Sequence, residues 1–179
     1  MNTSDMGLEL KFASGQALKA DGAQIEGYAS LFGIADQGGD IVQAGAYAAS
    51  LARLKGKGDR VRMLWQHDPT KPIGIWDEIA EDAKGLRVKG RLLPEIAQAR
   101  EATALIEAGA LDGLSIGYRT ISAERDTKGR RLLTEVELWE VSLVTFPMLP
   151  DARVGRKSDD ATCEMAAIFR AATDALRAK

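Results

Sequence analysis

The sequence holds a single cysteine and a single histidine in its 179 residues. One cysteine excludes an internal disulfide framework, and together with one histidine it cannot build a zinc site of the Cys/His type. The spacings of an EF-hand loop, an HExxH helix and a GxxxxGKS or GxxxxGKT phosphate loop are also missing. These absences exclude several common metal sites and P-loop chemistry, whereas metal ions bound by carboxylates alone remain open.

The sequence also lacks a large excess of either charge and lacks long apolar runs. The 24 Lys and Arg residues nearly balance the 26 Asp and Glu residues, which gives a net charge of −2. Such a balance leaves no electrostatic footprint for nucleic acid or for a membrane surface. No apolar run reaches the about 18 residues of a membrane span, and the opening MNTSDMGLELKFASG lacks the basic and apolar regions of a secretory signal. We therefore expect no nucleic-acid partner, no membrane span and a cytoplasmic location.

Alternating apolar and polar residues are what the sequence does contain. Strand-like runs, separated by turns rich in glycine and aspartate, occur at Ile25–Phe32, Val61–Gln66, Leu86–Leu92, Leu114–Ser122 and Leu132–Phe146. Two segments show helical spacing instead, at Ala44–Leu54 and between Pro94 and Gly109. So much β content at this length predicts a mixed, mostly β fold, a bent antiparallel β-barrel flanked by short helices, rather than a doubly wound sheet.

The sequence changes character near Arg153. From Ser158 onward, a capping serine, acidic residues in the first turn and basic residues at the end suit the dipole of a helix. The apolar residues of this segment recur at helical spacing, at Met165, Ile168, Phe169 and Ala172. We expect one main domain over residues 1–154, then a linker and an amphipathic C-terminal helix over residues 155–179. That helix either packs on its own domain or docks to a partner.

The only histidine, His67, follows the strand predicted at Val61–Gln66. If the strand continues, alternation places His67 on the same side as Met63 and Trp65. One interpretation is a core histidine whose ring nitrogens are satisfied by backbone groups. The other is a general base, because imidazole exchanges a proton near neutral pH with little tuning.

Ser115 lies between two glycines in the segment GLSIG, with Leu114 and Ile116 pointing to the other face. Flanking glycines let a substrate or another backbone approach closely, or form a bulge that re-aims a side chain. The serine is therefore either a polar residue on an ordinary strand or a nucleophile. The letters match the nucleophile elbow of α/β-hydrolases, but that elbow turns into a helix, whereas the residues after Ser115 continue as a strand.

Glu140 occupies a position that should be apolar, in register with Val136, Leu138 and Val144. A buried carboxylate without a partner costs several kcal/mol, so a cation or a hydrogen-bond donor should meet it. The partner is either an arginine, in a structural ion pair, or the imidazole N–H of His67. A bulge that turns Glu140 outward would remove the argument.

A serine, a histidine and a carboxylate on separate strands supply the parts of an acyl-transfer site. Such a site needs a base within about 3 Å of the nucleophile and a third group that fixes the tautomer of the base. The chain order here is His67, Ser115, Glu140, which differs from the better-known orders. Geometry rather than order defines these sites.

Five sequence blocks follow one another in a consistent order and spacing. They are EGYASLFGIADQGGDIVQAGAYAASL, VRMLWQHDPTKPIGIW, GLRVKGRL, EAGALDGLSIGYRT and LWEVSLVTFPMLPDARV. Together these blocks, which cover Ile25 to Val154, resemble the tailed-bacteriophage prohead protease family. The most specific pieces are LWQHD, GALDGLSIGY and EVSLVTFP. Members of that family are serine proteases of capsid maturation and are similar in fold to the herpesvirus maturation protease.

The resemblance implies a role for each of the three residues. His67 in LWQHD matches the general base, Ser115 in LSIGY matches the nucleophile, and Glu140, which precedes VSLV, matches the third member. Asp68 is the alternative acid, but strand alternation would point its side chain away from the side of His67. Such a reaction needs no cofactor and no metal.

The resemblance also implies partners and a location. The expected substrates are the major capsid protein and scaffold segments of a phage or phage-like particle, together with the protease itself. Cleavage would take place inside the immature capsid, in the cytoplasm of the bacterial host, and homo-oligomer formation is left open. Two alternatives remain at this point: a non-catalytic capsid assembly or scaffolding module with the same fold, and a cellular esterase or amidase.

Overall fold

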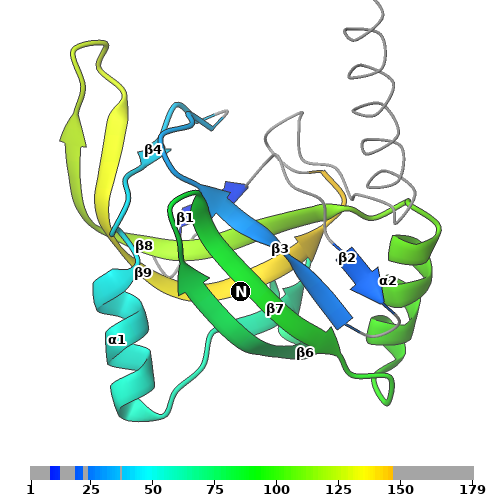
Figure 1. The fold of residues 1–179 in the computed structure, drawn as a ribbon. Helices are drawn as coiled ribbons and strands as arrows, with labels where there is room; N and C mark the ends of the chain where they lie inside the picture. The colour runs from blue at the N-terminus through cyan, green and yellow to red at the C-terminus, as the bar shows by residue number, and fades with distance from the viewer. Residues whose placement is uncertain (1–8, 13–18, 22–23, 37, 147–179) are drawn as a thin grey trace, which may run out of the picture.

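A computed structural model describes residues 9–12, 19–21, 24–36 and 38–146 (Figure 1). The strands are β1 (Glu9–Phe12), β2 (Lys19–Asp21), β3 (Gln24–Leu31), β4 (Ile41–Val42), β5 (Arg62–Trp65), β6 (Asp68–Glu81), β7 (Gly85–Leu92), β8 (Gly113–Arg125) and β9 (Arg131–Val144), and the helices are α1 (Ala48–Lys57) and α2 (Ala97–Glu107).

The strands of the described residues join into one bent sheet. Their order is β1-β8-β9-β5-β6-β7-β3-β2, and the short strand β4 pairs with β9. The long β8–β9 hairpin crosses behind β3, β6 and β7, while α1 lies beside β9 and α2 lies at the opposite end of the molecule (Figure 1). Buried apolar side chains from β3, β5, β6, β7, β8 and β9 form a single core, which includes Ile25, Met63, Ile73, Val88, Ile116 and Leu143.

This architecture confirms the predicted mostly β, bent fold with two short helices. The sheet is mixed rather than purely antiparallel, because β4 and β5 both run parallel to β9. Alternation in the sequence specifies which face a side chain takes but not the direction of the partner strand. The predicted C-terminal helix and the domain boundary at residue 154 lie outside the described residues and stay predictions.

The local sequence pattern did not predict β1, β2, β4 or β6. The first five residues of β6 include Pro69 and Pro72 and therefore look like a turn. Helix α1 begins at Ala48 rather than Ala44 and continues past Leu54 to Lys57, where Gly58 follows with a left-handed φ of 67°. Glycine at that C-terminal position meets no steric penalty, so it ends the helix there.

Gly90 of β7 allows the sheet to pack closely. A Cβ atom at Gly90 would lie 2.7 Å from Cε3 of Trp76 and 3.0 Å from Cε of Met63. It would also meet the carbonyl oxygen of Ile75 on the neighbouring strand β6. Backbone oxygen and the buried indole cannot move aside as a flexible side chain would, so glycine is required here.

We predict that Gly90→Ala destabilises the fold by about 1–3 kcal/mol, the usual cost of overpacking a well-packed core. The matched control is Gly56→Ala in α1, where a Cβ meets nothing within 4 Å. That control should be neutral or should stabilise the protein by up to about 1 kcal/mol, because alanine favours the helix. Urea unfolding of both variants measures the difference, and equal midpoints for the two would contradict this packing.

Candidate active site

A β-bulge in β9 determines which way its side chains point. Gly117 of β8 pairs with Glu140, but the next residue, Tyr118, pairs with Leu138. Strand β9 therefore carries one extra residue, Trp139, between the two pairs. An extra residue in one strand shifts the alternation of all residues that follow it.

The bulge separates the polar residues of β9 from the core. Leu138 before the bulge and Val141 and Leu143 after it all belong to the hydrophobic core. Glu140 and Ser142 alternate with these core residues and so lie on the opposite face of the sheet. Glu140 therefore does not point into the hydrophobic core, as unbroken alternation along β9 had predicted. It is nevertheless only 6% exposed.

His67 is held in a tight turn rather than in a strand. Trp65 of β5 pairs with Asp68 of β6, so Gln66 and His67 form a two-residue hairpin loop. Their φ angles are 52° and 59°, and positive φ at both central residues is the pattern of a type I′ turn. For residues other than glycine, such a conformation costs about 1–3 kcal/mol of free energy each.

The predicted orientation of His67 is wrong, because the residue lies in this turn and not in a strand. The expected strand ends at Trp65, so the alternation that grouped His67 with Met63 does not apply. Met63 is buried in the core, whereas the imidazole of His67 contacts Glu140. The turn therefore presents the ring to the polar face of β9.

The imidazole and the carboxylate form a buried hydrogen-bonded pair. Nδ1 of His67 lies 2.5 Å from Oε1 of Glu140, and the two side chains are 9% and 8% exposed. An ionised carboxylate only accepts hydrogen bonds, so with Glu140 ionised the donor in this contact is the N–H at Nδ1. This tautomer makes Nε2 the proton-accepting nitrogen of the ring. Of the two partners considered for Glu140, an arginine or the histidine, the structure has the histidine.

Ser142 hydrogen-bonds to both members of this pair. Its Oγ donates to Oε2 of Glu140 over 2.6 Å and accepts from the backbone N–H of His67 over 3.2 Å. Ser142 itself is completely buried. Ser142 was not among the predicted site residues, although its position two residues after Glu140 on a strand places both side chains on one face.

Ser115 lies on β8 directly across from Ser142. Residues paired in this way have Cβ atoms about 4.5–5.5 Å apart and share a face of the sheet. Ser115 is completely buried, and its neighbours Leu114 and Ile116 point into the core as predicted. Strand β8 continues to Arg125, so the serine is not at a strand-to-helix elbow. The sheet therefore places Ser115 beside the residue that links His67 and Glu140.

Asp68, the alternative acid, is engaged elsewhere. Its Oδ1 accepts hydrogen bonds from the backbone N–H of Thr70 over 2.9 Å and from the Thr70 hydroxyl over 2.6 Å. Lys71 lies 3.4 Å from the other carboxylate oxygen. The hydroxyl of Thr70 is the main reason that the pKa of Asp68 is held below its ordinary value. Asp68 thus stabilises its own turn, and Glu140 is the acid that contacts the imidazole.

Gly117 leaves room for the carboxylate. A Cβ at this position would lie 2.8 Å from both Cγ and Cδ of Glu140 and closer still to Oε1. The side chain of Glu140 therefore rests on the bare backbone of its partner residue. The contact between Gly117 and Glu140 was not predicted, because it depends on strand pairing that the local sequence pattern does not reveal.

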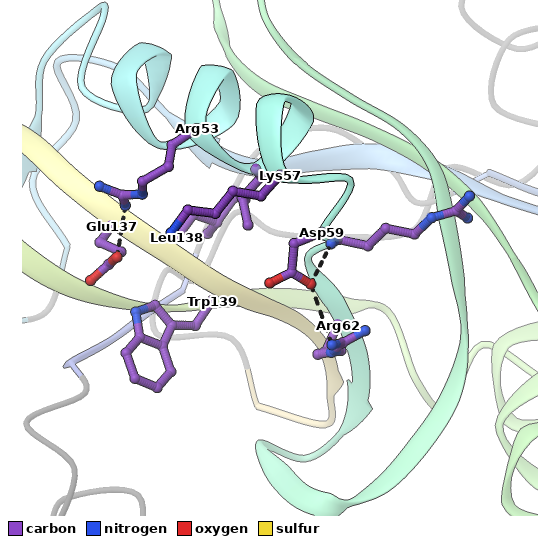
Figure 2. A pocket seen from close by; sticks show the side chains of 9 residues that line it. Arg53, Lys57, Asp59, Arg62, Glu137, Leu138 and Trp139 are labelled. Carbon is purple, nitrogen blue, oxygen red and sulfur yellow. Dashed lines mark hydrogen bonds and ion pairs between the residues drawn. The ribbon is translucent and has the colours of Figure 1, made fainter.

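A surface hollow of about 340 Å³ is lined by residues of α1, of β9 and of the segment 59–62 (Figure 2). Its lining is Arg53, Leu54, Lys57, Asp59, Arg60, Arg62, Glu137, Leu138 and Trp139. Among these lining residues, Arg53 forms an ion pair of 2.7 Å with Glu137, and Arg62 forms one of 3.4 Å with Asp59. None of the three candidate catalytic residues lines this hollow.

Two further searches cover only the ranges that the structure describes. Among those residues, no group of three or more His, Cys, Asp or Glu side chains is placed to hold a metal ion. None of the helices there has the length and apolar character needed to cross a membrane.

A bent β sheet with a buried imidazole–carboxylate pair and a buried serine on the neighbouring strand defines a candidate serine hydrolase. The sequence model of the Caudovirus prohead serine protease family matches residues 9–165. The chain therefore belongs to the prohead serine protease family of the tailed phages, as the sequence blocks indicated.

Individual proteins show the same relationship. The prohead protease of Enterobacteria phage HK97 is 36% identical over 144 residues, which are 78% of this chain and 60% of that protein. The prohead protease of Escherichia phage T5 is 30% identical over 132 residues, or 72% of this chain and 60% of that protein. The chain thus spans about 60% of the length of these relatives.

A solved structure matches the fold. The bacteriophage T4 capsid assembly protease, gp21, superposes with a TM-score of 0.66 over 78% of this chain and 98% of that one. Its sequence is only 14% identical, so this likeness establishes the shared fold alone.

We predict that Gly117→Ala displaces the carboxylate of Glu140 from the imidazole. Because His67 is the only histidine in the chain, the ¹⁵N and ¹H resonances of the imidazole report on this contact without ambiguity. The wild type should show one fixed tautomer with the proton on Nδ1, and Gly117→Ala should lose that preference. Gly56→Ala serves as the control and should keep the wild-type spectrum. An unchanged spectrum in the folded Gly117→Ala variant would contradict the contact.

Proposed function

We propose that this chain is a serine endopeptidase that cleaves capsid and scaffold segments during prohead maturation. Ser115 is the nucleophile, His67 is the general base, and Glu140 orients the imidazole. The observation that supports these roles most directly is the buried 2.5 Å contact between His67 and Glu140. The buried Ser115 lies on the strand next to that of Glu140, in a chain that belongs to the prohead serine protease family.

The reaction follows from the tautomer that Glu140 imposes. With the proton on Nδ1, Nε2 of His67 accepts the hydroxyl proton of Ser115 as Oγ attacks the peptide carbonyl. The imidazolium then donates that proton to the leaving amine, and Glu140 stabilises the positive charge. Water, activated by the same nitrogen, hydrolyses the acyl-enzyme and restores the serine. Hydrogen-bond donors to the oxyanion would each contribute about 3 kcal/mol to such a reaction.

The substrates and the location follow from the family. The relatives from phages HK97 and T5 are prohead proteases. We extend this role to the present chain: it acts inside the immature capsid, in the host cytoplasm, on the major capsid protein, on scaffold segments and on itself. The acyl-transfer steps require no metal or cofactor.

We predict that Ser115→Ala abolishes cleavage of the cognate capsid protein. Loss of the nucleophile should reduce the rate by at least about 1,000-fold, since only binding and oxyanion stabilisation remain. Coexpression with the capsid protein, followed by mass spectrometry of the fragments, measures the effect. Equal fragment patterns for wild type and Ser115→Ala would end the protease proposal. Capsid binding without cleavage by the wild type would instead favour the non-catalytic assembly module.

The two acids near His67 provide a matched pair of variants. We predict that Glu140→Gln lowers kcat by about 100- to 10,000-fold, because a neutral amide neither fixes the tautomer nor stabilises the imidazolium. Asp68→Asn should stay within about threefold of wild type, since that side chain contacts its own turn. Both rates are measured on one peptide that spans a capsid cleavage site. A larger loss from Asp68→Asn would reverse the assignment of the acid.

A further inference from the structure

Glu140 and His67 come from different parts of the chain, and one hydroxyl connects them. Glu140 is on β9, whereas His67 is in the turn between β5 and β6. Ser142 donates to the carboxylate through Oγ and accepts from the backbone N–H of His67 with the same atom. Strand β5 runs parallel to β9, with Leu64 paired to Ser142, so the serine lies where the turn leaves the sheet.

One of these hydrogen bonds restrains the rotation of the Glu140 carboxylate, and the other restrains the backbone at His67. The terminal torsion of a glutamate is broad, so Oε1 needs a second contact to stay directed at Nδ1. The Ser142 hydroxyl supplies that contact by holding Oε2. The backbone at His67 has a φ of 59°, an unfavourable region for this residue. The bond to the His67 N–H supports the turn in that conformation.

We propose that Ser142 is a positioning residue of the active site, which aligns Glu140 and His67 through this pair of hydrogen bonds. The inference rests on the proposed function for its kinetic consequence. Ser142 acts on the acid and on the turn, and not on the substrate. Its effect should therefore appear in kcat and in the tautomer of the imidazole, with KM unchanged.

The test compares three serine variants of the full chain. Ser142→Ala removes both hydrogen bonds, and Ser142→Thr keeps a hydroxyl at the same position. Ser50→Ala is the matched control, because Ser50 is equally buried and its Oγ accepts from the backbone N–H of Leu138. Should the alanine variant not fold, Ser142→Cys keeps the volume and offers only a weak donor, so it should shift both readouts in the same direction.

The first readout is the NMR spectrum of the single imidazole, which requires no substrate. Wild type, Ser142→Thr and Ser50→Ala should show the proton fixed on Nδ1, whereas Ser142→Ala should show a mixture of tautomers. The second readout is the rate at which a fluorophosphonate probe modifies Ser115. We expect that rate to fall about 10- to 100-fold in Ser142→Ala, the effect of losing a hydrogen bond to a charged group. Ser142→Thr should recover most of it.

The outcomes separate this inference from the proposed function. If the wild type is active and Ser142→Ala keeps both its spectrum and its rate, Ser142 has no positioning role and the protease assignment stands. Equal losses in Ser142→Ala and Ser50→Ala would indicate general destabilisation and would also overturn the inference. If the wild type does not react with the probe, the proposed function fails, while the spectra alone still decide whether Ser142 controls the imidazole.

Discussion

The hydrogen bond between His67 and Glu140 is the interaction on which the whole candidate site depends, and a single extra residue makes it available. Without the bulge at Trp139, the alternation of β9 would direct Glu140 into the hydrophobic core. With the bulge, one strand supplies apolar side chains to the core and carboxylate and hydroxyl groups to the opposite face. The neighbouring strand adapts through Gly117, which has no side chain where the carboxylate lies.

The backbone turn that carries His67 is strained. Two consecutive residues, Gln66 and His67, adopt left-handed conformations that cost about 1–3 kcal/mol each. Contacts to β9 and to the residues after it hold this turn: Ser142 binds the His67 N–H, and the Gln66 amide donates to Thr145 over 2.5 Å. The strained turn at His67 is thus held by the same strand that carries Glu140. This coupling explains how a short hairpin loop can present an imidazole in one fixed orientation.

The sequence pattern predicted the positions of strands and helices better than it predicted how the strands pair. Alternation located β3, β7, β8 and β9 closely, and helical spacing located α2, because each of these patterns is local. Strand β6 was missed because prolines near its start imitate a turn. The bulge at Trp139 and the turn at His67 were not predicted as such, because both depend on which residues of a partner strand lie opposite. For the same reason Ser142 and Gly117 received no role in the site, although Ser115, His67 and Glu140 could be named from residue type and family resemblance.

A crystal structure of the protein after reaction with a fluorophosphonate would test the central claim most directly. The account predicts a phosphonate bonded to Oγ of Ser115, with Nε2 of His67 within about 3 Å of the adduct and Glu140 still on Nδ1. An adduct on Ser142 or on any other serine, or a Ser115 adduct out of reach of the imidazole, would contradict it.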